Sequence, residues 1–372
     1  MQGFGPSIAL LARAESEIAL IERVQPLGFD REYQRLLLLW GSGREAEPRF
    51  RYAPRCHLGR LKRALAAISA GGFAALEVAA ERRAEREPAQ PIAEYADPSW
   101  VAERAQELLL EARLVEIVGT SEFSGMASER FAPPLGALAA TLESNSRDWI
   151  AQGAATHSDE PCFRSDDPKA TQSLLSLVLR RVGRLRIPVR VLVNRGLVSV
   201  AACGDAVIVI RGNSLLTARA AARITEHEVC GHLLPRLAAR ARSDILCCGC
   251  AGASADEEGR ALLIEERLGL MDPWRRAELG ARHLASSNLR HGATFVDVVR
   301  QLVGHGASTE LALRATMRAF RGGGLGREIM YLPAWVRLKR AFEAEPAVER
   351  WFERGRASLA YAIGRQSNSQ AA

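Results

Sequence analysis

The sequence predicts a mostly helical α+β fold with one small antiparallel sheet directly before a long histidine-containing helix. Apolar residues recur at helical spacing through most of the 372 residues, whereas residues 188–210 alternate apolar with other side chains. Hydrophobic residues make up 48% of the chain, which is enough for the core of one large or two ordinary domains. We therefore expect helices at both ends of the chain and a short sheet near its middle.

Residues 1–96 are predicted to form a mainly helical region. The helical pattern runs over residues 7–83 and includes a clear helix at 58–68, but glycines and prolines within 41–54 mark an internal loop. The stretch 87–98 is the best candidate for a linker. We therefore expect a domain boundary after residue 96.

Residues 97–363 are predicted to form the second domain, followed by a polar, disordered tail at 364–372. Asp97 caps and Pro98 opens its first helix, which ends at Gly119. Three antiparallel strands joined by two turns are predicted within 188–210. An edge strand of this sheet could hold an extended peptide, or the sheet could only support the next helix. Further helices are predicted at residues 274–286, 294–304, 309–321, 335–342 and 348–361.

A long helix over residues 218–242, capped by Thr217 and bent at Pro235, carries the motif His227-Glu228-Val229-Cys230-Gly231-His232. In an undistorted helix, a spacing of five residues would place the two imidazoles about 140° apart. One inserted residue of π-helix restores a common face, and Gly231 adds backbone freedom. We therefore predict a local π-helical distortion between the two histidines.

A second helix, at residues 255–268, is predicted to supply the third side chain of a metal site through Glu258. Two imidazoles and one carboxylate are a ligand set of catalytic zinc, and a second carboxylate can take a proton from the water that the ion activates. The sequence therefore predicts His227, His232 and Glu258 as zinc ligands and Glu228 as the general base. From the pattern alone, two ordinary helix histidines and a solvated acidic patch remain an alternative.

Cys247, Cys248 and Cys250 raise a second hypothesis, a structural zinc site that would make the protein a binding module. Structural sites prefer cysteine pairs separated by two to four residues, and the adjacent pair is awkward for tetrahedral geometry. The spacing therefore disfavours this hypothesis without excluding it.

The histidine motif and the acidic motif resemble those of the microtubule-associated tyrosine carboxypeptidases and their bacterial relatives, the flavohaemoglobin expression-modulating QEGLA motif proteins. This chain has Glu257-Glu258-Gly259-Arg260-Ala261 where the bacterial motif has Gln-Glu-Gly-Leu-Ala. The resemblance extends over residues 35–351. It includes three further elements, which are Gly119-Thr120 with Phe123 and Ser128, Phe320-Arg321-Gly322-Gly323, and Arg327-Glu328-Ile329-Met330-Tyr331-Leu332.

Positions 260, 326, 327 and 328 also depart from the family pattern. Arg260 replaces leucine, Arg327 and Glu328 replace lysine and aspartate, and Gly326 stands where a threonine would be. The charges at 327 and 328 are the same as in the family, but the side chains differ in length. The threonine hydroxyl has no counterpart here.

The resemblance implies a zinc metallopeptidase of the carboxypeptidase type, built around the three predicted ligands. Such an enzyme needs a cation for the terminal carboxylate of its substrate, and Arg321 and Arg327 are the candidates. Tyr331 is a candidate donor to the oxyanion. The expected partner is the C-terminus of a peptide or protein, with aromatic last residues among the expected substrates.

Charge and hydropathy argue against other partners. The net charge of +7 comes from arginines scattered among many glutamates, and the densest basic run, 180–190, lacks interleaved aromatic residues, so nucleic-acid binding is not expected. The longest aliphatic run, Leu36–Trp40, is too short to cross a bilayer. Acidic residues interrupt the N-terminal apolar pattern, and seven cysteines without a signal peptide suit the reducing cytoplasm, which is the expected location.

Two other functions fit the same residues. One is a zinc hydrolase of a non-peptide amide or ester, and the other is a non-enzymatic regulatory protein that zinc stabilises. Neither the natural substrate nor the oligomeric state follows from the sequence.

The metal content of three proteins separates the two zinc hypotheses. We expect His232→Ala to lose zinc, and the Cys247/Cys248/Cys250→Ser variant to keep the wild-type zinc content, because imidazoles and not thiolates are the predicted ligands. Zinc per chain is measured in each folded protein. Loss of zinc from the cysteine variant instead would make the site structural.

Overall fold

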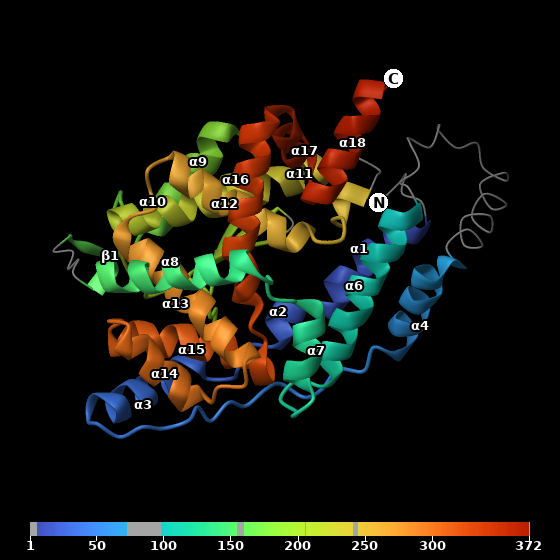
Figure 1. Ribbon diagram of the computed structural model, residues 1–372. Helices are drawn as coiled ribbons and strands as arrows, with labels where there is room; N and C mark the ends of the chain where they lie inside the picture. Colours follow the sequence, from blue (N-terminus) through green and yellow to red (C-terminus); the bar gives the residue numbers. More distant parts are fainter. Residues whose placement is uncertain (1–5, 73–97, 155–159, 205, 241–244, 372) are drawn as a thin grey trace.

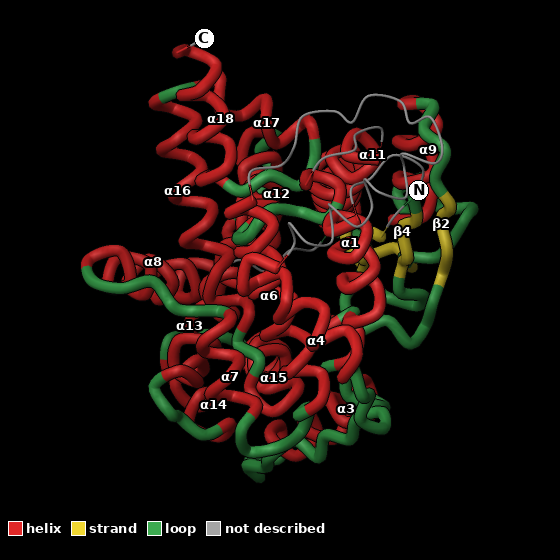
Figure 2. The backbone as a smooth tube through the Cα atoms, turned by 90° about the vertical axis from the view of Figure 1, so that its right-hand side faces the viewer, coloured by secondary structure: helices red, strands yellow, loops and turns green. Residues whose placement is uncertain are grey.

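The computed structural model describes residues 6–72, 98–154, 160–204, 206–240 and 245–371. Helices make up 67% of the structure and the strands are short, which confirms the predicted α+β, mostly helical class (Figure 1). Figure 2 shows the strands at one edge of a body that is otherwise helical. No helix in these described residues is long and apolar enough to span a membrane.

The N-terminal region is helical, as predicted, as far as the structure describes it. Its elements are α1 (Pro6–Ile18), α2 (Leu20–Arg23), α3 (Phe29–Gly41), α4 (Gly59–Ala67) and the π-helical turn η1 (Ile68–Gly72). The loop predicted within 41–54 is present between α3 and α4. Most of the predicted linker lies outside the described residues, so the boundary after residue 96 stays a prediction.

The middle of the chain contains α6 (Pro98–Glu116), α7 (Phe123–Arg130), α8 (Ala137–Ala154) and α9 (Leu174–Leu185). Helix α6 begins at the predicted Pro98, while its predicted cap Asp97 lies outside the described residues. The helix ends three residues before Gly119, whose φ of 79° is the left-handed conformation that glycine adopts readily.

The sheet before the histidine-containing helix differs from the predicted antiparallel one. The described residues contain five strands, namely β1 (Cys162–Arg164), β2 (Arg190–Val193), β3 (Ala201–Gly204), β4 (Val207–Ile210) and β5 (Leu215–Thr217). The hairpin β3–β4 is antiparallel as expected, but β4 lies between β2 and β3 and pairs with β2 in parallel.

Burial explains why β4 takes the central position in this sheet. Ile208 and Ile210 of β4 are fully buried, whereas Leu192 and Val193 of β2 are 46% and 45% exposed. The most apolar strand therefore occupies the middle, and β2 lies at an edge. The alternation that predicted the strands carries no information about this order. Strands β1 and β5 form a separate antiparallel pair.

The C-terminal half is helical, as predicted. Its elements are α10 (Ala218–Glu226), η2 (His227–Leu233), α11 (Leu234–Arg240), η3 (Ile245–Cys247), α12 (Ala253–Arg267), α13 (Pro273–Arg290), α14 (Phe295–Gly304), α15 (Thr309–Gly324), η4 (Arg327–Met330), α16 (Tyr331–Ala344), η5 (Pro346–Val348), α17 (Glu349–Arg354) and α18 (Leu359–Ala371).

Helix α18 includes most of the stretch 364–372 for which the sequence predicts a disordered tail. It extends to Ala371. Gln366 is 9% exposed and its Oε1 accepts a hydrogen bond of 2.8 Å from Arg350. This contact ties a polar segment to the body of the protein, which polarity alone does not reveal.

Helices and strands surround the histidine-containing segment η2, and the two ends of the chain pack together in one core. Helix α12 packs against η2 on one side and α16 on another, while β3, β4 and α9 also contact η2. The largest buried cluster contains apolar residues from α1, α6 and α18, so the two ends of the chain share one core. In Figure 1 both ends accordingly lie on the same side of the molecule.

The glycine-rich end of α15 forms a bend that buries Arg321. Gly322 and Gly323 have φ values of 76° and 107°, and a Cβ on Gly322 would lie 2.6 Å from the Phe123 ring. Arg321 is 2% exposed and donates a hydrogen bond of 2.9 Å to Glu328, which also accepts from Arg318 at 2.6 Å. Although burial disfavours the Glu328 carboxylate, Arg321 and Arg318 hold its pKa at about 2.

We expect Glu328→Gln to lower the free energy of unfolding at pH 7 by about 3 kcal/mol, because Arg318 and Arg321 lose their buried counter-ion. The native pKa lies below the ordinary value of 4.5, so this stabilisation is complete above about pH 5 and disappears between about pH 5 and 2. Denaturant unfolding of both proteins across this range should show the difference shrinking as the pH falls.

Glu310→Gln is the matched control, because Glu310 pairs with Arg314 on the exposed face of α15. It should change the stability by less than about 0.5 kcal/mol. Equal effects of the two variants, or a pH-independent effect of Glu328→Gln, would contradict the assignment.

Candidate metal centre

The metal helix has the predicted π-helical segment between its two histidines. Thr217 caps α10, because its side chain accepts a hydrogen bond from Ala220 N at 3.1 Å. Residues 227–233 then form η2, in which each turn contains one more residue than an α-helical turn. His227 and His232 consequently face each other, with 3.3 Å between their Nε2 atoms.

Helix α12 places Glu258 against this pair. Its Oε2 lies 3.5 Å from His227 Nε2 and 3.9 Å from His232 Nε2. Four ligands at zinc-bond lengths of about 2.0–2.1 Å lie about 3.3–3.4 Å apart in a tetrahedron, so the three observed spacings fit one small metal ion. These three side chains form the one group of metal-ligand type found among the described residues.

Glu265 fixes the orientation of His227 from behind the site. It is fully buried two helical turns after Glu258, and its Oε1 lies 2.7 Å from His227 Nδ1. Arg275 donates two hydrogen bonds to the same carboxylate, at 2.8 and 2.9 Å. The imidazole therefore donates through Nδ1 and keeps Nε2 directed at the metal triangle. Sequence reasoning missed this role, although the seven-residue spacing from Glu258 places both carboxylates on one helix face.

The two imidazoles have opposite protonation tendencies. Burial lowers the pKa of His232 to about 4, so this ring is neutral, as a metal ligand must be. Burial also disfavours the charged form of His227, but the Glu258 and Glu265 carboxylates outweigh it and raise the pKa of His227 to about 9. His232 Nδ1 is buried and has no hydrogen-bond partner among the described residues.

Glu228 lies next to the metal triangle as a buried carboxyl group. It is 9% exposed, and burial raises its pKa to about 7. None of the described residues donates a hydrogen bond to it. A carboxyl group with a pKa near neutrality can both accept and return a proton, which suits a general base.

Arg327 and Tyr331, the predicted substrate-binding and oxyanion residues, lie beside Glu258 of the triangle. Arg327 donates to the Tyr331 hydroxyl at 3.0 Å and lies 3.4 Å from Oε1 of Glu258, the oxygen that is farther from His227. Arg321, the other predicted substrate-binding residue, does not contact the three ligands. Burial lowers the pKa of Arg321 to about 10, and its guanidinium is paired with Glu328, beside Arg327 in the sequence.

The wall behind the triangle carries an excess of positive charge. Its ion pairs link six arginines to four glutamates, namely Arg223, Arg275, Arg282, Arg318, Arg321 and Arg327 with Glu258, Glu265, Glu278 and Glu328. An excess of largely shielded guanidinium groups among the described residues favours a negatively charged group at this wall.

Small residues let the two ligand-bearing helices approach each other. A Cβ on Gly231 would lie 2.6 Å from the Ala261 Cβ, and a Cβ on Gly259 would lie 2.7 Å from the Ala334 backbone. Gly231 is therefore required for close packing of η2 on α12. Gly231 has no positive φ, so the requirement for glycine that the structure shows is this close packing.

The three clustered cysteines do not form a second metal site in the described residues. Cys248 and Cys250 are fully buried, and Cys248 Sγ donates to Ile245 O at 3.3 Å. They belong to no group of converging metal-type side chains. Buried thiols that fill the core are the simpler interpretation.

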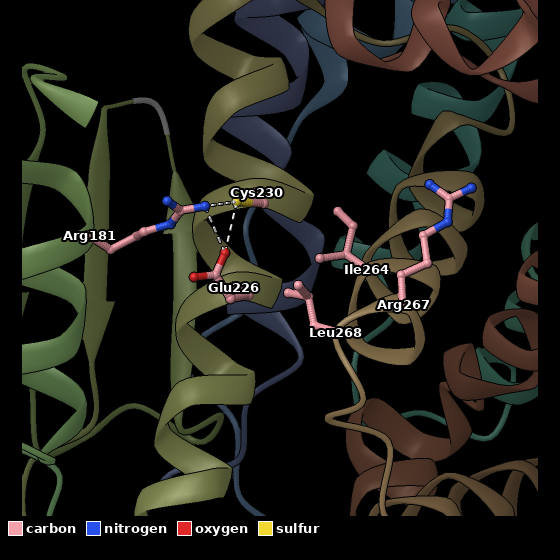
Figure 3. A pocket seen from close by; sticks show the side chains of 6 residues that line it. All are labelled: Arg181, Glu226, Cys230, Ile264, Arg267 and Leu268. Atoms are coloured by element: carbon pink, nitrogen blue, oxygen red, sulfur yellow. Dashed lines mark hydrogen bonds and ion pairs between the residues drawn. The ribbon is translucent and has the colours of Figure 1, made fainter. Parts of the chain in front are cut away.

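A cavity of about 260 Å³ lies between the two ligand-bearing helices, and no metal ligand lines it. Figure 3 shows Arg181, Glu226 and Cys230 on one side and Ile264, Arg267 and Leu268 on the other. Arg181 donates to both Glu226 and Cys230, at 3.0 and 3.2 Å.

Comparison with known proteins gives one result. The family model described as microtubule-associated tyrosine carboxypeptidase matches residues 43–356. A search of curated proteins and a search of solved structures found no match. The match covers both ligand-bearing helices and the bend at Arg321.

We expect Gly231→Ala to lower the free energy of unfolding by about 1–3 kcal/mol and to weaken zinc binding, because the added methyl group overlaps Ala261. Adding Ala261→Gly should restore both properties by removing the overlapping carbon. Thermal unfolding and zinc titration against a competing chelator provide the measurements.

Gly183→Ala is the matched control, because a Cβ at this position of α9 would contact nothing within 4 Å. It should leave zinc binding unchanged and stabilise the helix slightly. Failure of Ala261→Gly to rescue Gly231→Ala would show that the two positions are not in contact.

Proposed function

Because the chain belongs to the microtubule-associated tyrosine carboxypeptidase family, we propose that it is a zinc-dependent carboxypeptidase that removes the last residue of a peptide or protein. The observation that carries the proposal is the convergence of His227, His232 and Glu258 with Glu228 beside them. Aromatic last residues are the first substrates to test, in keeping with the name of the family.

His227, His232 and Glu258 would hold the zinc ion, with Glu265 and Arg275 fixing the first imidazole. The bound ion would polarise the scissile carbonyl group and increase the acidity of a water molecule. Glu228 accepts a proton from the attacking water at a carboxylate oxygen. The same oxygen then returns the proton to the leaving amine nitrogen.

Arg327 is the proposed contact for the terminal carboxylate of the substrate. Its guanidinium is held by Tyr331 and Glu258 at the edge of the triangle, and the wall behind it has six arginines for four glutamates. A carboxylate there can accept two parallel hydrogen bonds from one guanidinium. Arg321 would support this contact indirectly through Glu328, and the Tyr331 hydroxyl would donate to the developing oxyanion.

Strand β3 offers a place for the substrate backbone. It is the last strand in the order β2-β4-β3 and contacts η2. An extended peptide could add to this strand by backbone hydrogen bonds.

We expect Glu228→Gln to lower kcat by about 10²–10⁴-fold while zinc per chain stays at the wild-type value, because only the proton-transfer group is lost. The assay is mass spectrometry of peptides that differ in their last residue, with C-terminally amidated copies as substrates that lack the carboxylate. Amidated copies should resist the wild-type protein.

Glu226→Gln is the control, since Glu226 lies two residues earlier on the same helix and lines the cavity away from the ligands. It should retain activity. Intact peptides together with hydrolysis of a small ester or amide would favour the non-peptide hydrolase. Wild-type behaviour of Glu228→Gln in every assay would favour the non-enzymatic regulator.

A further inference from the structure

At the C-terminal end of η2, two backbone carbonyl groups each lack one of their possible helical donors. In a π-helical turn each N–H donates to the carbonyl five residues earlier, and Leu234 N donates to Val229 O in this way. The next donor would be residue 235, which is a proline without an N–H. Cys230 O therefore lacks its π-helical donor, and Gly231 O lacks its α-helical donor.

Arg260 supplies the missing donor from the neighbouring helix. Its NH1 atom lies 2.8 Å from Cys230 O and 3.5 Å from Gly231 O. It is the second residue after the ligand Glu258 and precedes Ala261, which packs on Gly231. Among the described residues Arg260 makes no ion pair, so these two carbonyls are its partners.

The guanidinium bridge lies beside the cavity between the two helices. Ile264 lies one turn after Arg260 on α12 and lines this cavity opposite Cys230 (Figure 3). The bridge therefore links η2 to α12 at the border of the cavity. A partly buried carbonyl left without a donor would favour a different helical register.

We propose that Arg260 is a positioning residue that replaces the missing N–H of Pro235 and thereby holds η2 in the π-helical form that brings His227 and His232 together. The inference rests on the metal-binding part of the proposed function and not on any substrate. It assigns a role to the position at which this chain has arginine in place of the leucine of the related bacterial motif.

Zinc affinity of Arg260→Met, measured by chelator competition, provides the first test. We expect a loss of about 10–100-fold, because the variant keeps the length of the side chain but has no donor. Adding Pro235→Ala should restore most of the affinity, since the backbone N–H that this substitution introduces can donate to Cys230 O. Pro235→Ala alone should bind zinc as the wild type does. Circular dichroism verifies that each variant is folded.

Arg267→Met is the control for loss of charge, because Arg267 lies two turns further along α12 and pairs with Glu349 at the surface. It should change zinc affinity less than twofold. Equal losses in Arg260→Met and Arg267→Met, no loss in Arg260→Met, or no rescue by Pro235→Ala would each overturn the proposal.

Amide hydrogen exchange of residues 227–234 gives a second measurement that needs no metal. Arg260→Met should speed exchange in this segment and Arg267→Met should not. A wild type that binds no zinc would refute the proposed function, while the exchange rates would still decide the role of Arg260. Unchanged exchange in Arg260→Met would then count against it.

Discussion

The structure depends on one extra residue between two histidines. With five residues from His227 to His232, an α-helix would direct the imidazoles apart, and only the π-helical η2 gives the 3.3 Å approach of their Nε2 atoms. Glu258 can complete a ligand set, and Glu265 can orient one of its imidazoles, only when His227 and His232 lie this close together. A local change in helical register therefore decides whether the three candidate ligands can converge.

Helix α12 turns that local change into a site. On one face it carries Glu258 and, two turns later, Glu265, so one helix supplies both a candidate metal ligand and the carboxylate that orients His227. Between them, Gly259 admits α16 and Ala261 fits against Gly231. Residues of the candidate site thus alternate with closely packed residues along this stretch of the helix. A larger side chain at a packed position would therefore displace the two carboxylates.

The sequence predicted the parts of the site that depend on local spacing. The π-helical segment follows from counting residues per turn and the Thr217 cap from the preference of threonine for helix N-termini, and the structure confirms both. The convergence of Glu258 with the histidines was expected from the ligand chemistry and the family resemblance and not from local spacing, and the structure shows it. Contacts between distant segments were beyond this reasoning. The parallel pairing of β2 with β4 depends on which strand is buried, and the burial of Arg321 depends on Glu328 and Phe123, so neither follows from a local pattern.

The contact between Gly231 and Ala261 also limits how such a sequence can diverge. A methyl group added at either position must be removed at the other, so bulk can be exchanged between the two helices only in coupled steps. Each single step passes through an overpacked or a loosened intermediate. The small residues at positions 231 and 261 are therefore needed for one helix contact. In proteins that share this architecture, the side-chain sizes at these two positions should vary together.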